Sequence, residues 1–107
     1  MEKAYAYFED LAAELPELPA DSIVSRTLYE DEQHKAILFG FAAGQELSEH
    51  TASQTALLYF IQGEAQLRLG EDDRRALPGT WVRMEARLPH SVKAETELVM
   101  MLILMKQ

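Results

Sequence analysis

Apolar residues recur at two different spacings along this chain, and the spacing changes near residue 21. Between Lys3 and Leu15 they stand three or four positions apart, which places them on one side of a helix. Pro16 and Pro19 end that pattern, because proline cannot continue a helix. The sequence therefore predicts a short N-terminal helix, whose apolar stripe consists of Ala4, Tyr5, Phe8, Leu11, Ala12 and Leu15.

Beyond Asp21 apolar and polar residues alternate, which is the period of a β-strand. The predicted strands are IVSRTLY (23–29), KAILFGFA (35–42), TALLYFIQ (55–62), GEAQLRLG (63–70), WVRM (81–84), HSVKA (90–94) and LVMMLILM (98–105). The last of these is apolar throughout, so we expect a strand that is buried on both faces. The shared faces that alternation predicts are Ile37, Phe39 and Phe41; Leu57, Tyr59 and Ile61; and, facing inward, Ala65, Leu67 and Leu69.

Short strands at this spacing, separated by turn signals, predict an antiparallel sandwich or barrel. GEDD at residues 70–73 predicts a hairpin, and LPGT at 77–80 and ETE at 95–97 predict further turns. A chain of 107 residues is long enough for one such core and too short for a second domain. We expect residues 1–20 to form the helical segment and residues 21–107 to form an all-β domain.

Charge and cysteine content narrow the classes of function. Ten basic residues against 18 acidic ones give a formal charge of -8, with no basic stripe, so we expect no nucleic-acid partner. The chain has no cysteine, which excludes disulfides, a thiolate nucleophile and cysteine-bound zinc. Glu2, Glu9 and Asp10 interrupt the start of the chain where a secretory signal is apolar, and the run at 98–105 is shorter than the roughly 20 residues of a membrane helix. These features predict a cytoplasmic protein that does not enter a membrane.

Two spaced motifs in the β region resemble those of a known family. Gly44, His50, Ala52, Ala56 and Gly63 stand at the spacing of the first motif of the cupin family, a small jelly-roll barrel. In that family the two alanine positions usually hold a second histidine and a glutamate. The resemblance covers roughly residues 36–105 and extends to small single-domain cupins of the conserved-barrel type with a reduced metal-ligand set.

The second cupin motif is matched by Gly79, Glu85, Arg87 and His90. Glu85 stands where the family usually has proline, Arg87 where it has glycine, and Ala94 where it has asparagine. His50 and His90 fall on ligand positions of the family, which is the specific part of the resemblance. It implies a cupin-like jelly-roll barrel as the fold.

The resemblance also implies a metal site, which this chain carries in reduced form. The usual set is three histidines and a glutamate, suited to zinc, nickel, iron or manganese. Here only His50 and His90 remain, and two imidazoles hold a divalent ion weakly. Gln54 is a poor ligand, so Glu85 is the better candidate for a third, although an exposed carboxylate paired with a neighbouring arginine is the simpler interpretation of it.

Replacing imidazole and carboxylate by methyl groups inside a barrel leaves volume, so the sequence predicts an apolar pocket. Its polar groups would be the two histidines, and Met100 or Met101 could contribute to its wall. The other predicted pocket residues are Phe39, Phe41, Ala52, Gln54, Ala56, Trp81 and Met84.

Three classes of function stay open on the sequence. The leading one is a barrel that binds a small molecule, with a weakly held divalent metal as an option. The alternative is a metal-dependent dioxygenase, isomerase or decarboxylase, or a metal-free enzyme with His90 as general base. The third is an interaction protein whose histidines are structural. We also expect a homodimer, because dimerisation would cover the apolar terminal strand or helix stripe.

Overall fold

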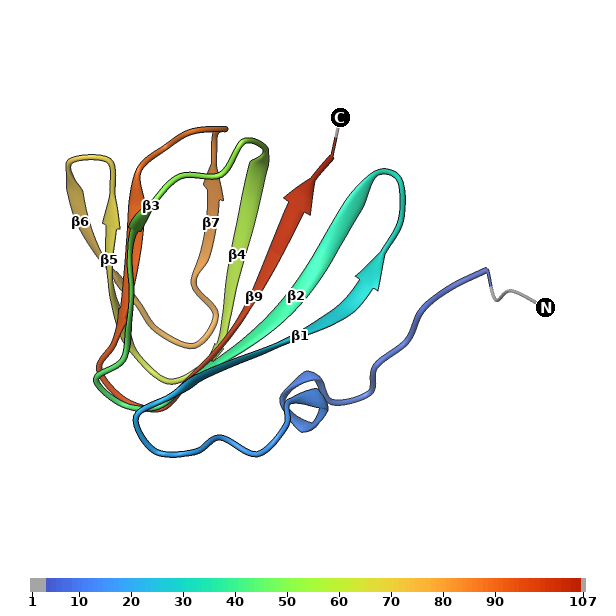
Figure 1. The fold of residues 1–107 in the computed structure, drawn as a ribbon, viewed down its shortest axis with the longest axis horizontal. Coiled ribbons are helices and arrows are strands. Elements are labelled where there is room, and N and C mark those ends of the chain that lie inside the picture. Colours follow the sequence, from blue (N-terminus) through green and yellow to red (C-terminus); the bar gives the residue numbers. More distant parts are fainter. Residues whose placement is uncertain (1–3, 107) are drawn as a thin grey trace.

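The computed structural model describes residues 4–106, except for the side chains at positions 49 and 50. Nine strands and one turn of 3-10 helix make up the regular structure of this part of the chain (Figure 1). In chain order the elements are η1 (Leu11–Glu14), β1 (Ile23–Glu30), β2 (His34–Phe41), β3 (Glu46–His50), β4 (Thr55–Gln62), β5 (Ala65–Leu69), β6 (Asp72–Ala76), β7 (Trp81–Met84), β8 (His90–Ala94) and β9 (Leu98–Met105).

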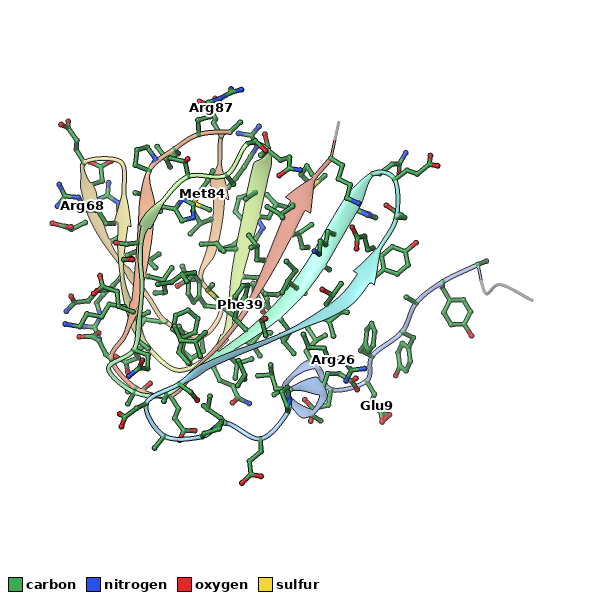
Figure 2. All side chains as sticks on the ribbon, in the orientation of Figure 1. Glu9, Arg26, Phe39, Arg68, Met84 and Arg87 are labelled. Atoms are coloured by element: carbon green, nitrogen blue, oxygen red, sulfur yellow. The ribbon has the colours of Figure 1, made fainter. Side chains whose placement is uncertain are left out.

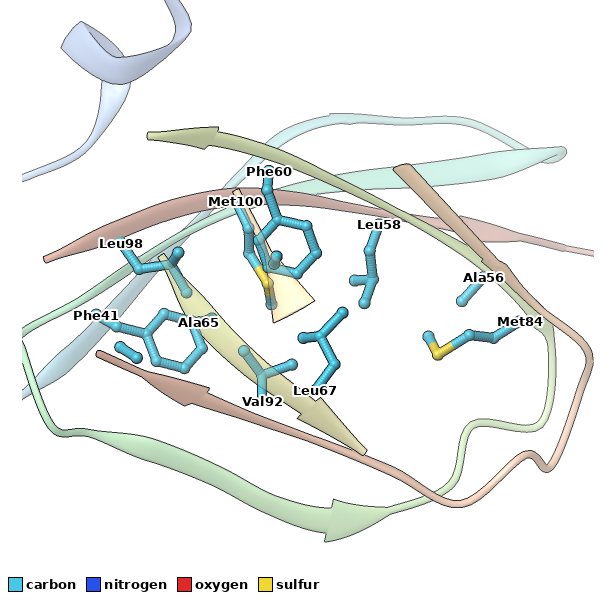
Figure 3. Packing of buried hydrophobic residues seen from close by; sticks show 12 residues of the cluster. Phe41, Ala56, Leu58, Phe60, Ala65, Leu67, Met84, Val92, Leu98 and Met100 are labelled. Carbon is cyan, nitrogen blue, oxygen red and sulfur yellow. The ribbon is translucent and has the colours of Figure 1, made fainter. Parts of the chain in front are cut away.

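The strands form two sheets, and every pairing within them is antiparallel. One sheet has the order β1-β2-β9-β4-β7 and the other the order β3-β8-β5-β6. The sheets form opposite walls of the molecule and enclose the core between them (Figures 1 and 3). The predicted all-β fold is confirmed.

Alternation along the strands places the core residues on the inner faces of both sheets. Phe39 and Phe41 share the inner face of β2, and Ala65 and Leu67 share that of β5, as the sequence predicts. On β4 the predicted trio of Leu57, Tyr59 and Ile61 does share a face, but it is the outer one. The inner face of β4 carries Ala56, Leu58 and Phe60, which are at most 2% exposed (Figure 3).

Strand β9 lies between β2 and β4, near the middle of its sheet. Leu98 and Met100 on its inner face are buried, whereas Met101 on the outer face is only half-buried and Met105 is 37% exposed. The expectation that this strand is buried on both faces therefore holds only for the inner face at Leu98 and Met100.

The predicted N-terminal helix is wrong in extent, because only the 3-10 turn at Leu11–Glu14 forms. A short amphipathic helix is marginal in water and needs a packing partner along its whole stripe. Here the contact is local: Leu15 lies against Gly40 of β2, where an added Cβ would meet its Cδ1 at 2.9 Å. Arg26 lies beside this turn (Figure 2) and donates to the carbonyl and carboxylate oxygens of Glu14, at 3.0 and 2.9 Å. No helix in residues 4–106 has the length and apolar character needed to cross a membrane.

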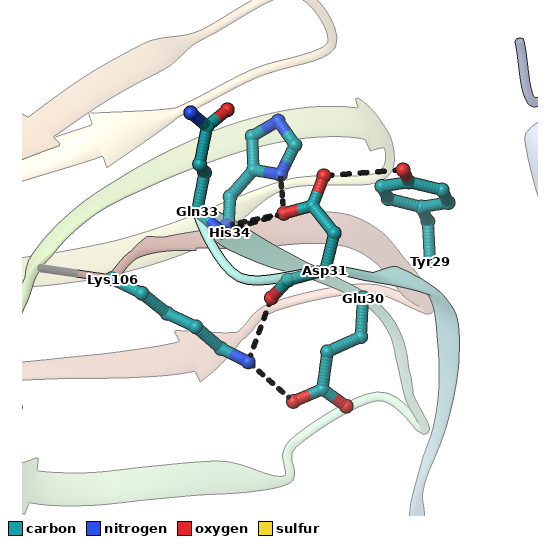
Figure 4. A network of polar contacts seen from close by, with 6 residues as sticks. All are labelled: Tyr29, Glu30, Asp31, Gln33, His34 and Lys106. Carbon is teal, nitrogen blue, oxygen red and sulfur yellow. Dashed lines mark hydrogen bonds and ion pairs between the residues drawn. The ribbon is translucent and has the colours of Figure 1, made fainter. Parts of the chain in front are cut away.

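The turn residues of two hairpins account for how their strands are joined. Gly70 has φ 63° at the first position of the two-residue loop between β5 and β6, as a type II′ turn requires, so the predicted hairpin is confirmed. In the loop from β1 to β2, the Asp31 carboxylate accepts the backbone N–H groups of Gln33 and His34, both at 2.8 Å. Lys106 then bonds Glu30 at 2.7 Å and ties the end of the chain to this hairpin (Figure 4).

Candidate functional site

His90 begins β8 and faces the barrel interior. It is 6% exposed and is the one polar side chain in the buried class among those that the structure describes. Its Nδ1 lies 2.9 Å from the Leu88 carbonyl oxygen, which can only accept, so Nδ1 carries the proton in this bond. In the neutral ring, Nε2 is then the nitrogen with the lone pair. The backbone thereby orients this imidazole and selects its tautomer.

The register of β3 and β8 brings the two predicted histidine positions together. The Cα atoms of His50 and His90 are partners in this pairing, next to an irregularity that separates them from the Leu47 pair. On its other side His90 is the partner of Leu69 in β5. The His50 side chain lies outside the described residues, so its role as a metal ligand stays a prediction.

Met84 lies in the region where the sequence predicts a cavity. Ala56 is its register partner across β4 and β7, and both residues are 2% exposed. The Met84 side chain lies beside the Ala56 methyl group in the packed interior (Figure 3). Two hollows lie elsewhere, along β5, β6 and β7.

The other predicted pocket residues separate into interior and surface groups. Phe41 is fully buried, and Phe39 packs beside it with ring centroids 6.3 Å apart. Ala52 and Gln54 are half-buried in the loop before β4. Trp81 is 59% exposed, because the β4–β7 register pairs it with Tyr59 on the outer face. Its predicted place inside the barrel is therefore wrong.

Glu85, the candidate third ligand, is exposed in the turn that follows β7. Its backbone carbonyl accepts the Leu88 N–H at 3.2 Å, and its carboxylate makes no ion pair with Arg83 or Arg87. Nearby, the Arg87 N–H donates to the Ala52 carbonyl at 2.7 Å. This bond joins the loops before β4 and before β8 at the end of the barrel where His90 lies.

A groove that the sequence reasoning did not identify lies between β6 and β7, with a volume of about 330 Å³. We call it the β6–β7 groove; it is lined by Leu67, Leu69, Arg74, Trp81, Val82 and Arg83, together with Arg75 and Thr80. The hairpin could have indicated this groove, because a two-residue turn places Arg74 opposite Leu67, whose side chain faces inward. A second, more open hollow of about 430 Å³ lies against the same strand and includes the carboxylate of Asp73.

Comparisons with known proteins show which solved structures share this fold. No protein-family model matches the sequence, and no curated protein matches it significantly. A conserved protein of unknown function from Streptococcus pyogenes is 26% identical with a TM-score of 0.83, over 100% of this chain and 91% of the other. A cupin 2 conserved barrel domain protein from Leptotrichia buccalis is 29% identical with a TM-score of 0.81, over 92% of this chain and 47% of the other. This chain belongs to the cupin superfamily.

A third solved structure, a cupin superfamily protein from Desulfitobacterium hafniense, is 20% identical with a TM-score of 0.84, over 95% of each chain. At that identity the likeness concerns the cupin fold alone. The matches thus support the barrel that the sequence predicts. They do not identify a reaction or a ligand, which have to be inferred from the residues of this protein.

The described side chains around His90 do not by themselves make up a catalytic metal site. In the described part of the chain, no three His, Cys, Asp or Glu side chains come together in a group that could hold an ion. Methyl groups stand at the family ligand positions Ala52 and Ala56, and Leu69 is the partner of His90. A catalytic metal such as zinc takes three protein ligands and keeps a position open. These residues do not supply such a set.

Proposed function

We propose that this cupin is a binding protein that takes up a small organic molecule at the end of the barrel around His90. One observation supports it most: a buried imidazole, that of His90, which is oriented by the Leu88 carbonyl and lies among apolar side chains. A few oriented polar groups in an apolar surround are typical of small-molecule sites. Its packed interior means that the ligand displaces side chains such as Met84, which is unbranched and can adopt other rotamers.

The competing candidate is a metal-dependent enzyme, and the β3–β8 register that pairs His50 with His90 is the observation in its favour. The donor set argues against it for the reason given above. Elemental analysis of tag-free protein therefore belongs in the test. Near-stoichiometric metal that disappears in a His50→Ala, His90→Ala double variant would contradict the proposal.

The proposal is tested by thermal unfolding with a panel of small sugars, amino acids and organic acids. A ligand present at a hundredfold excess over its Kd stabilises the folded state by about 2.7 kcal/mol, which is readily measured. We expect stabilisation of the wild type that is lost in His90→Gln. His34→Gln is the matched control. His34 is a half-exposed histidine at the start of β2 that pairs with Asp31 and not with the residues around His90.

Circular dichroism at the start of each scan checks that both variants are folded. Equal stabilisation of the wild type and His90→Gln by every responding ligand, uncharged ones included, would move the site away from His90. The absence of any response across the panel would favour a structural barrel in which His90 only joins β8 to the preceding turn.

A further inference from the structure

The β6–β7 groove lies where the edges of the two sheets meet. Strand β6 pairs only with β5, and β7 pairs only with β4, so each is the edge strand of its sheet. The groove runs between these edges, and its floor is formed by the apolar side chains of Leu67, Leu69 and Val82. A volume of about 330 Å³ lies in the range of small-ligand pockets.

Positive charge gathers in this groove although the whole chain carries a formal charge of -8. Three arginines, Arg74, Arg75 and Arg83, line it, and its lining includes no carboxylate. Arg83 makes no ion pair with any of the described side chains, so none of the described carboxylates satisfies its guanidinium. An unpaired arginine at the rim of an apolar floor is suited to bidentate recognition of a planar anion.

The other two arginines differ in how far the protein already neutralises them. Arg75 pairs with Glu64 and lies 3.8 Å from Glu95, so its charge is largely satisfied. Arg74 has the weaker ion pair, 3.8 Å from Asp72; its Nη1 donates to the Asp73 carbonyl oxygen at 3.0 Å, and 63% of its side chain is exposed. An exposed pair at that distance contributes little, so Arg74 can turn to an incoming anion at small cost.

Trp81 supplies the remaining feature. It is 59% exposed, and its indole lines the same groove as Arg83, two positions along β7. A large aromatic surface left open beside cationic groups matches a ligand with an apolar or aromatic body and one negative end. A purely inorganic anion would leave the indole and the apolar floor unused.

We propose that the β6–β7 groove binds a small organic carboxylate, with its carboxylate on Arg83 and Arg74 and its apolar body between Trp81 and the floor. The site is separate from the barrel end around His90 and goes beyond the function proposed above. Binding occurs at the surface seam and requires no metal.

Trp81 is the one tryptophan of the chain, so its fluorescence reports on this groove directly. The probe is benzoate, titrated to about 1 mM, with benzamide as its neutral isostere. We expect a saturable change in emission with benzoate, no change with benzamide, and weaker binding as sodium chloride is added.

Charge-neutral variants test the assignment. Arg83→Gln and Arg74→Gln should each weaken benzoate binding about tenfold or more, because each removes a charge-assisted hydrogen bond. Arg87→Gln is the matched control: Arg87 is exposed, makes no ion pair with a described residue, and does not line the groove. His90→Gln should keep the wild-type affinity, which separates this site from the barrel end.

Four results would overturn the proposal. They are equal loss in Arg83→Gln and Arg87→Gln, binding of benzamide as tight as that of benzoate, no emission change with benzoate, or a response to a polyglutamate peptide alone. Equal loss in Arg83→Gln and Arg87→Gln would indicate that only the overall electrostatic potential of the protein attracts benzoate. A response to polyglutamate alone would indicate that the groove binds an acidic peptide.

Discussion

Gly63 joins β4 to β5 with φ 86°, a conformation that side-chain-bearing residues rarely adopt. A Cβ built there would lie 2.0 Å from the carbonyl oxygen of Glu97, which is backbone and cannot move aside. We expect Gly63→Ala to lower the free energy of unfolding by about 3 kcal/mol, combining left-handed strain with overpacking. Urea denaturation followed by circular dichroism measures it.

Gly44 supplies a matched control, because its φ is 85° but an added Cβ would meet nothing within 4 Å. Gly44→Ala should therefore cost only the conformational part, about 1 to 2 kcal/mol. Equal losses at the two glycines would show that the contact with Glu97 is relieved by movement of the loop.

At the scale of elements, the β1–β2 hairpin depends on an ionised carboxylate. Backbone N–H groups of His34 and Gln33 bond to Asp31 and lower its pKa from 3.8 to about 2. The salt link to Lys106 lowers the pKa of Glu30 in the same direction (Figure 4). Because the folded-state pKa of Asp31 is depressed, its contribution to stability is present above pH 3.8 and is lost as pH falls toward about 2.

We expect Asp31→Asn to reduce the loss of stability across this pH window relative to the wild type. Denaturant unfolding at pH values between about 2 and 3.8 measures the difference. Asp10→Asn is the control, since the Asp10 carboxylate makes no hydrogen bond to the described residues. Identical acid profiles for Asp31→Asn and the wild type would mean that the turn opens without affecting folding.

At the scale of the whole molecule, the outer face of the five-stranded sheet is covered by other parts of the chain over only some of its strands. Leu15 and the 3-10 turn cover β1 and β2, where Leu38 is fully buried. Over β9, β4 and β7 the outer face presents Met101, Tyr59 and Trp81 in one cross-strand row. Over β9, β4 and β7 the described residues of this face carry the charge of Arg83 and are otherwise uncharged, so the net charge of -8 opposes self-association least here.

We propose that a second copy covers the part of this face over β9 and β4, around Met101 and Tyr59, leaves Trp81 and Arg83 open to the β6–β7 groove, and makes the protein a homodimer. Light scattering after size-exclusion chromatography should give twice the chain mass for the wild type and the monomer mass for Tyr59→Glu, which buries a charge at the interface. Leu77→Glu is the control, because Leu77 is 46% exposed in the β6–β7 turn, outside this face. A monomeric wild type, or dissociation of both variants, would contradict the proposal.

Strand positions were predictable because alternation is a local property of the backbone. The predicted bounds of β7, β8 and β9 agree with the structure, and Gly70 marks the hairpin turn. The N-terminal helix failed because its stripe is covered only in part: Tyr5 is exposed, whereas Leu11 and Leu15 are half-buried. In β4 the run from Ala56 to Ile61 is apolar on both faces, so alternation alone could not tell core from surface.

The sequence by itself determined the all-β class, the strand order along the chain and the two histidine positions, since these depend on periodicity and residue spacing. Only the tertiary structure decided which faces meet. Side-chain orientation depends on strand register, and register depends on contacts between segments far apart in the chain. This is why Met84 is found packed beside Ala56, why Trp81 lies outside the barrel, and why Arg74 and Arg83 share a groove.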